Sequence, residues 1–277
     1  PGALVIGVSH EGGTWATIRA LTAARDVGAT VALITAAAGS PGASIADIVV
    51  STEEMDQSWC HTVGYLSPIL AGAAVGAHVG ASVLDTPAAT ALLEAGMSEP
   101  ASAAIEELAR KLMGVRHLLV VGSGSDRIAA RELTLKVEEG AHLPAAMRDL
   151  ETMLHGHLAG TDDETGLVLV LADPVARGAR TARALGVLRA CRELGIQAGA
   201  IVSAVVNGEI DPSLTPAGRV LVADAATLPA SVAALLGTAI PLQRLTEMLA
   251  IIRGVNPDPI RRDDARYLAA AEACDCG

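Results

Sequence analysis

The sequence predicts an α/β protein with two doubly wound lobes, each a parallel sheet flanked by helices, and with the first lobe truncated at its N-terminus. Short apolar runs alternate with helical segments along the chain, which is the pattern of a parallel sheet covered on both faces. A strand–turn–helix–strand unit occurs twice. The second copy follows about fifty residues of βα pattern that start at His117, whereas only three residues precede the first copy. By symmetry, we expect a strand and a loop of the first lobe to be missing.

The strands are predicted from runs of Val, Leu, Ile and Ala that end at small or polar residues. In chain order they are Leu4–Ser9, Thr30–Thr35, Asp47–Val50, Leu118–Gly122, Leu167–Ala172, Ala198–Ser203 and Val220–Ala223. Helices are predicted in the segments between and after them, beginning after Thr14, Thr62, Ser102, Ser125, Val175, Ser231 and Pro241. This order gives the repeated βαβ arrangement that the fold class requires.

The internal repeat sets the expected domain organisation. The first copy runs from Leu4 to Thr35 with Gly28 closing its helix, and the second runs from Leu167 to Ser203 with Gly195 in the same place. The two closing glycines are 167 residues apart. We expect a partial first lobe over residues 1–100, a second lobe over residues 101–245, and a C-terminal helix and tail over residues 246–277.

Composition excludes several kinds of partner. Of 277 residues 51% are hydrophobic and 18% are charged, so the chain can bury a sizeable core. The net charge of −11 and the absence of a Lys or Arg run argue against nucleic acid and against an anionic membrane. No signal peptide opens the sequence, so a cytoplasmic protein is expected. Leu66–Leu84 is uncharged and carries glycines at four-residue spacing, which fits a membrane helix or a buried helix, and its Ala and Gly content favours the buried helix.

The four cysteines are too few for a disulfide framework. Cys60 and Cys191 lie in apolar runs and are expected to be reduced core residues. Cys274 and Cys276 flank Asp275 at the end of the chain, where they fit either a metal-binding or oxidisable pair or a frayed tail, and we favour the tail. We expect neither a metal nor a cofactor.

The turn between the first strand and the first helix is the main candidate for a binding site. Its sequence is Ser9-His10-Glu11-Gly12-Gly13-Thr14. Glycines let the backbone approach a ligand closely, and hydroxyls with free N–H groups at a helix N-terminus suit an anion. The alternative is an ordinary N-cap, which Thr14 alone would supply. Glu11 is a carboxylate in the same turn and would repel a phosphate.

A second candidate lies on the helix after Gly122-Ser123-Gly124. Glu132, Lys136 and Glu139 share one side of this helix, away from the solvated side. Charged groups on a less exposed face are costly unless they are paired or used. The spacing therefore fits either a catalytic cluster or a stabilising i, i+4 pair.

Two histidines that flank a glycine form the third candidate. His155 and His157 follow the segment 150–154, which contains Glu151. A histidine near a carboxylate is a common acid–base arrangement, although an isolated histidine is more often structural. Because no further ligand lies at suitable spacing, a zinc site is not expected.

Taken together, these motifs resemble the sugar isomerase (SIS) domain family, and in particular the isomerase half of glutamine–fructose-6-phosphate aminotransferase and related deaminases. The resemblance covers nearly the whole chain. The segment 9–14 is similar to the family's phosphate loop Ser-x-Ser-Gly-x-Thr, and Trp59-Cys60-His61-Thr62 stands where the family has a sugar-contacting Val-Ala-Ser-Thr. The segment 132–139 resembles Glu-Gly-Ala-Leu-Lys-Leu-Lys-Glu, and His155-Gly156 falls on the family's His-Gly.

The resemblance implies roles for these residues. It makes Glu139 the base that moves a proton between C1 and C2, and it has His155 assist ring opening in the site of a neighbouring subunit, so a homodimer is expected. Lys136 and Glu132 would orient the sugar hydroxyls. The implied substrate-binding residues are Ser9, His10, Gly12, Gly13, Thr14, Trp59, His61 and Glu132.

The chain also departs from the family. Glu11 replaces a phosphate-binding serine, the family's upstream Gly-x-Ser loop would precede Pro1, and the reactive C-terminal lysine has no counterpart. We therefore expect a sugar-phosphate-binding SIS protein acting as an aldose–ketose isomerase or an amino-sugar-phosphate deaminase. The alternative is a non-catalytic sugar-phosphate sensor or binding module.

Overall fold

The computed structural model describes residues 2–80 and 82–274, and these residues form two compact units, residues 1–84 and residues 85–277. Cys276, one of the two C-terminal thiols considered above, lies outside the described residues. The division at Leu84 falls before the expected boundary at residue 100.

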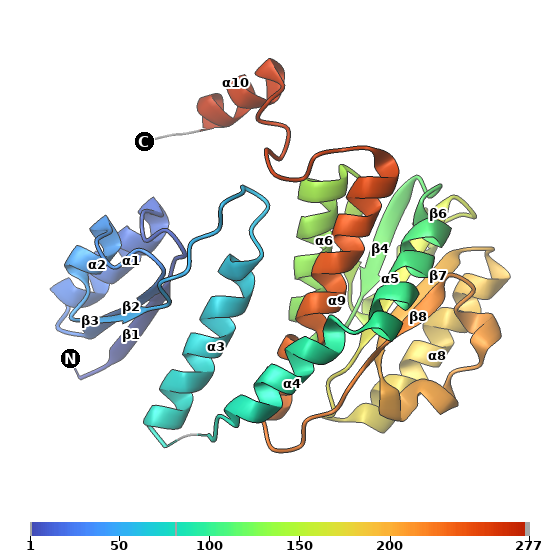
Figure 1. The fold of residues 1–277 in the computed structure, drawn as a ribbon, viewed down its shortest axis with the longest axis horizontal. Helices are drawn as coiled ribbons and strands as arrows, with labels where there is room; N and C mark the ends of the chain where they lie inside the picture. The colour runs from blue at the N-terminus through green and yellow to red at the C-terminus, as the bar shows by residue number, and fades with distance from the viewer. Residues whose placement is uncertain (1, 81, 275–277) are drawn as a thin grey trace. The chain divides into compact units, whose positions relative to one another are not determined.

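Unit 1 is a three-stranded parallel sheet with helices (Figure 1). Its strands are β1 (Leu4–Val8), β2 (Thr30–Thr35) and β3 (Ile48–Ser51), and they lie in the order β1-β2-β3. Its helices are α1 (Trp15–Asp26), α2 (Pro41–Ile45) and α3 (Val63–His78). The small core contains Leu21, Val31 and Leu33, whereas every second residue of the edge strand β1 is exposed.

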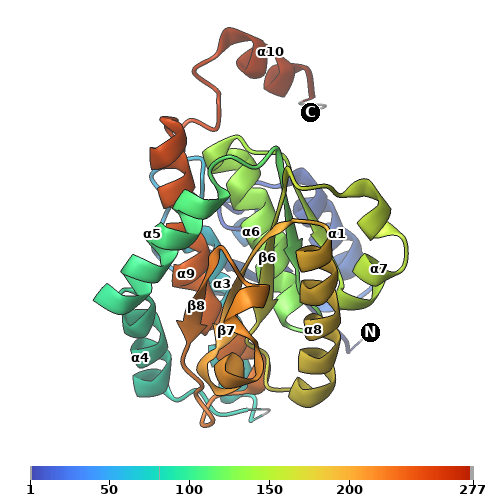
Figure 2. The same ribbon diagram turned by 90° about the vertical axis from the view of Figure 1, so that its right-hand side faces the viewer.

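Unit 2 contains a five-stranded parallel sheet of order β5-β4-β6-β7-β8 (Figures 1 and 2). The strands are β4 (His117–Val121), β5 (Ala145–Arg148), β6 (Thr165–Leu171), β7 (Gln197–Ser203) and β8 (Gly218–Val222). The helices are α4 (Thr86–Gly96), α5 (Glu99–Leu112), α6 (Asp126–Ala141), α7 (Leu150–Leu154), α8 (Arg177–Glu193), α9 (Ala230–Arg253) and α10 (Ala265–Cys274). Three 3-10 turns complete the unit at His157–Gly160, Ala204–Glu209 and Pro212–Leu214.

Helices cover both faces of this second sheet. Helices α5, α6 and α9 lie on one face, and α9 packs along α4, α5 and α6 (Figure 2). Helices α7 and α8 lie on the other face, where Leu169, Val187 and Cys191 belong to one fully buried cluster. All seven predicted strands form, and the three-strand and five-strand sheets differ in the expected direction.

Several predicted elements differ from the structure. Strand β5 and helices α2, α4 and α7 were not expected. β5 and α7 have only four and five residues, and α2 and α4 begin near prolines, which local rules assign to loops. The two helices expected after Ser231 and Pro241 are one helix, α9, with Pro241 buried inside it. Tertiary packing along α9 offsets the hydrogen bond that a proline cannot make.

The helix predicted within Leu66–Leu84 forms as part of α3, but it ends at His78. Among its described residues Ala73 is the one that is buried, so the predicted burial of the whole segment is wrong. At 16 residues, α3 is shorter than the roughly 20 residues that span a bilayer. Within the described ranges, only α9 is long and apolar enough to cross a membrane, but 61% of its apolar window is buried, as in a core helix.

Candidate functional site

The loop from Ser9 to Thr14 in unit 1 is a tight turn held by its own polar groups. The Gly12 N–H donates to the Ser9 carbonyl at 3.1 Å, and the Ser9 and Thr14 hydroxyls lie 3.1 Å apart. Gly12 has φ +65°, and a Cβ there would lie 2.0 Å from the Ser40 hydroxyl, so this position requires glycine. Gly13, by contrast, faces open space.

The same loop leaves the start of α1 without a side-chain cap. Thr14 is the N-cap residue, but its hydroxyl bonds Ser9 and makes no capping bond. The N-cap interpretation of the turn is therefore not realised, and hydroxyls and N–H groups remain at a helix N-terminus, as an anion site requires. Glu11 is exposed within the loop.

A His–Asp pair, which sequence reasoning did not find, lies directly beside this loop. The Asp56 backbone N–H donates to Nε2 of His10 at 3.2 Å, and an Asp56 carboxylate oxygen lies 3.2 Å from the same nitrogen. The ring of His61 is 5.3 Å from the ring of His10, while Trp59 is half exposed. The structure therefore brings His10 and His61 together, and their role in binding stays a prediction.

Asp56 also holds the start of α3. Its carboxylate accepts from the backbone N–H groups of Thr62, Val63 and Gly64 at 2.8, 3.0 and 2.6 Å. Burial raises the pKa of Asp56, but these backbone hydrogen bonds outweigh it, so the pKa lies below its ordinary value. Asp56 is thus ionised at neutral pH and fixes the segment that carries His61.

The second candidate cluster lies on α6 in unit 2. Lys136 is 4% exposed, and its ammonium lies 2.7 Å from Oε2 of Glu139 and 3.8 Å from Oε1 of Glu132. Both readings of the spacing are therefore compatible with the structure, since the charges are paired and also largely buried. The cluster has two carboxylates and one ammonium, so the negative charge of one carboxylate is not fully neutralised.

Glu132 is that carboxylate. Burial raises its pKa to about 6; the Lys136 charge opposes this rise and the Glu139 charge adds to it. Its Oε1 is buried and makes no hydrogen bond within the described residues. A buried carboxyl that titrates near neutral pH is typical of acid–base sites.

The side chain of His155 bonds Glu151 and Arg183 rather than the carboxylates of Glu132 and Glu139. Its Nε2 is 2.7 Å from Glu151, which also receives two bonds from Arg183, and its side chain is 67% exposed. The Arg183 and His155 hydrogen bonds lower the pKa of Glu151. No hydrogen bond or ion pair among the described residues joins His155 to Glu139, so a role in another subunit's site stays a prediction.

The described residues contain no group of three or more His, Cys, Asp or Glu side chains able to hold a metal. Cys60 and Cys191 are buried, as expected, and burial raises the pKa of the Cys191 thiol to about 12. The structure therefore has two candidate functional sites. One is the Ser9–Thr14 loop with the adjacent His61, and the other is the Glu132–Lys136–Glu139 cluster on α6.

The fold is that of the sugar isomerase (SIS) domain proteins, as the sequence resemblance indicated. The C-terminal domain of glucosamine-fructose-6-phosphate aminotransferase from Francisella tularensis superposes with a TM-score of 0.77 at 20% identity, covering 92% of this chain and 73% of that chain. Tagatose-6-phosphate ketose/aldose isomerase from Escherichia coli gives a TM-score of 0.73 at 18% identity, covering 94% and 70%. Glucosamine-6-phosphate deaminase from Thermotoga maritima gives 0.64 at 15% identity, covering 93% and 72%.

In sequence, the chain is similar to the glutamine–fructose-6-phosphate aminotransferase [isomerizing] of Symbiobacterium thermophilum. The two are 29% identical over 182 residues, which is 62% of this chain and 30% of that relative. The chain thus spans less than a third of the length of the curated relative it matches. A comparison with protein-family models finds no match.

Proposed function

We propose that this protein is a sugar-phosphate isomerase or amino-sugar-phosphate deaminase that transfers a proton between neighbouring carbons of its substrate. The buried Glu132–Lys136–Glu139 cluster on α6 is the observation that carries the proposal. Aldose–ketose exchange needs a carboxylate to accept and return a proton, and an ammonium to stabilise negative charge developing on the oxygen. Solved structures with the same fold are named as a domain of an aminotransferase, a sugar-phosphate deaminase and a ketose/aldose isomerase.

In this proposal, Glu139 accepts the proton. Glu139 is the more exposed of the two carboxylates, at 23% against 14% for Glu132, and it is bonded to the ammonium at 2.7 Å. Glu132, with its pKa near 6, is suited to hold or release a proton at a substrate hydroxyl. The Ser9–Thr14 loop of unit 1, with its hydroxyls and N–H groups at the start of α1, is proposed separately as an anion site.

The test is proton exchange at C1 of fructose 6-phosphate and at C2 of glucosamine 6-phosphate, followed by NMR as deuterium wash-in from heavy water. Glu139→Gln keeps the shape of the side chain but removes its basicity, so exchange should fall by at least 100-fold while binding is retained. The matched control is Glu138→Gln, because Glu138 is the exposed neighbour on the same helix. If Glu139→Gln exchanges at the wild-type rate, Glu139 is not the base.

A non-catalytic sugar-phosphate sensor is the second candidate, and the exposed Glu11 in the binding loop favours it. A sensor binds its ligand without exchanging protons. Binding of a hexose phosphate by the wild-type protein without deuterium wash-in on either substrate would therefore support the sensor and contradict the enzyme.

A further inference from the structure

Strand β8 is an edge strand of the five-stranded sheet in unit 2, because it pairs with β7 on one side only. The Ala217 N–H donates to the Ala198 carbonyl on β7, whereas the Gly218 N–H donates within the preceding turn and so points away from β7. Successive residues of a strand direct their backbone groups to its two sides in turn. The N–H and C=O groups of Val220 and Val222 therefore face outward from the sheet.

These outward groups are unpaired in the described part of the chain. The hydrogen bonds outside the β7 ladder include none to Val220 or Val222. A hollow of about 390 Å³ borders this strand, and its lining includes Leu221 from one face of β8 and Val222 from the other, so it follows the free edge. Small side chains of α4 and α5, such as Ala95 and Ala101, line the rest. There is thus room beside the edge for a further strand.

The edge carries little of the protection that keeps strands from pairing, such as a proline, a bulge or an outward charge. The residues of β8 are Gly-Arg-Val-Leu-Val, and their register with β7 is unbroken. The Arg219 guanidinium turns back onto its own chain, where Nε donates to the Thr215 hydroxyl at 2.7 Å and Nη1 to the Asn207 carbonyl at 3.0 Å. Leu221, in contrast, is 46% exposed, and covering it would be favourable.

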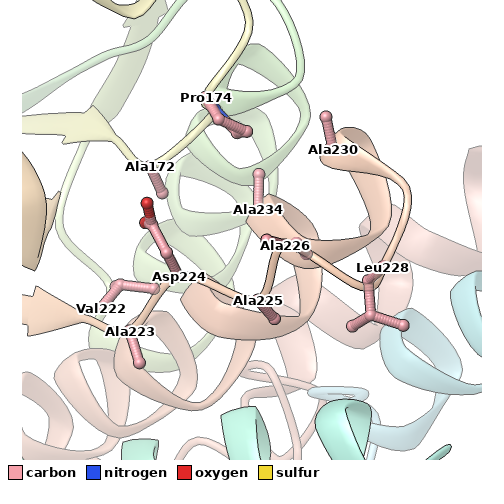
Figure 3. Close-up of a pocket in the computed structure, with 11 residues that line it drawn as sticks. Ala172, Pro174, Val222, Ala223, Asp224, Ala225, Ala226, Leu228, Ala230 and Ala234 are labelled. Atoms are coloured by element: carbon pink, nitrogen blue, oxygen red, sulfur yellow. The ribbon is translucent and has the colours of Figure 1, made fainter. Parts of the chain in front are cut away.

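The pairing segment ends at Val222. Beyond it, Ala223–Ala226 run past a separate cavity of about 180 Å³ toward the start of α9 (Figure 3). Asp224 lies in this stretch and pairs with Arg177 at 2.8 Å. The strand thus has a basic residue, Arg219, near its start and an acidic residue just after its end, which favours an antiparallel partner of the same sequence over a parallel one.

We propose that β8 is an interface with β8 of a second copy of this chain, paired antiparallel about a two-fold axis at Leu221. In this register Val220 lies opposite the partner's Val222. Both residues face outward, so each of the two equivalent pairs exchanges two N–H···O bonds. Leu221 packs against the partner's Leu221, and Arg219 lies beside the partner's Ala223, so like charges do not oppose each other.

A surface that matches itself in this way is what a symmetric dimer requires. The result is one continuous sheet across two copies, in which the outward backbone groups and the exposed Leu221 are covered. The interface contains no residue of the Glu132–Lys136–Glu139 cluster, so it does not depend on the proposed isomerisation.

Leu221→Cys tests the register, in a chain whose Cys274 and Cys276 are replaced by serine. The two opposed residues at the axis form a non-hydrogen-bonded pair with Cα atoms about 4.5 Å apart, which a disulfide can bridge. Leu194→Cys is the matched control, since Leu194 is 41% exposed at the end of α8. In a glutathione buffer, Leu221→Cys should form a covalent dimer at least tenfold faster than the control on non-reducing gels. Equal rates overturn the proposal.

Leu221→Lys gives a second readout, because it sets two ammonium groups against each other at the axis. The dimer dissociation constant from sedimentation should rise at least tenfold, whereas Leu194→Lys should leave it unchanged, with circular dichroism confirming that both variants are folded. A dimer that keeps its dissociation constant in Leu221→Lys has its interface elsewhere, for example at His155, and overturns the proposal. A wild-type protein that stays monomeric at high micromolar concentration overturns it too, and leaves the edge to a different partner.

Discussion

Lys136→Met should destabilise unit 2 in a way that depends on pH. Methionine keeps the apolar stem of the lysine but removes the ammonium that lies between Glu132 and Glu139. Lys136 is 4% exposed, so water cannot fully replace the lost charge. The two carboxylates then face each other without compensation, which raises the free energy of the folded state.

The size of the effect follows from the two distances. At an effective dielectric of about 20, attraction over 2.7 Å and 3.8 Å amounts to about 6 and about 4 kcal/mol before desolvation is subtracted. Removing one partner of a buried pair costs about 3–5 kcal/mol in practice. Since Glu139 is 23% exposed and partly rehydrates, we expect a loss of about 3 kcal/mol at pH 8.

The pH dependence comes from Glu132, whose pKa is about 6 in the folded protein against an ordinary value of 4.5. A raised folded pKa means that its contribution to stability is fully present below about pH 4.5 and is lost as pH rises through about 6. The Lys136 charge lowers this pKa, so the methionine variant raises it further. The part of the destabilisation that comes from Glu132 should therefore be absent at pH 5, so the total should be smaller at pH 5 than at pH 8, while the part that comes from Glu139 remains.

Urea unfolding followed by circular dichroism at pH 5 and pH 8 measures this difference. The matched control is Lys111→Met, since Lys111 is the chain's other lysine and is exposed on α5. An equal loss at both pH values would refute the assignment of the effect to Glu132. No loss at pH 8 would show that the ammonium does not stabilise the pair.

Three further outcomes are expected. Glu11→Ser removes a like charge and adds a donor, so inorganic phosphate and hexose phosphates should bind about fivefold more tightly by calorimetry; unchanged binding would mean that the carboxylate faces away. Asp56→Ala removes the cap of α3 and should cost about 1–2 kcal/mol, seen as faster hydrogen exchange in that helix at pH 7, and unaltered exchange would contradict the capping role. Light scattering should give a dimer at micromolar concentration if His155 serves a neighbouring subunit, and a monomer would count against that role.

The sequence was most informative where structure depends on near neighbours in the chain. Strand β6 is buried along its whole length, so its unbroken apolar run revealed it, and the i, i+4 spacing of Glu132 and Lys136 placed them on one face of a helix. Strand β5 has only four half-buried residues, which leaves no pattern to detect.

Pairings between distant segments could not be predicted. Asp56 meets His10 across 46 residues of chain, and nothing near either residue signals the partner. At Pro241 the local rule was misleading. A proline favours the start of a helix, but Pro241 is buried inside α9, where contacts with three other helices keep the helix continuous. Local propensity was overridden there by packing.

The place of α9 in the chain has a consequence for synthesis of the protein. This helix covers α4, α5 and α6, yet all three leave the ribosome long before it does. Until α9 emerges, their apolar faces remain open to water, and α9 itself is the most membrane-like segment of the described chain. Unit 2 thus completes its core only after Arg253 has emerged, more than 100 residues after α5, so chaperones that shield nascent apolar surface should matter more for this unit than for unit 1.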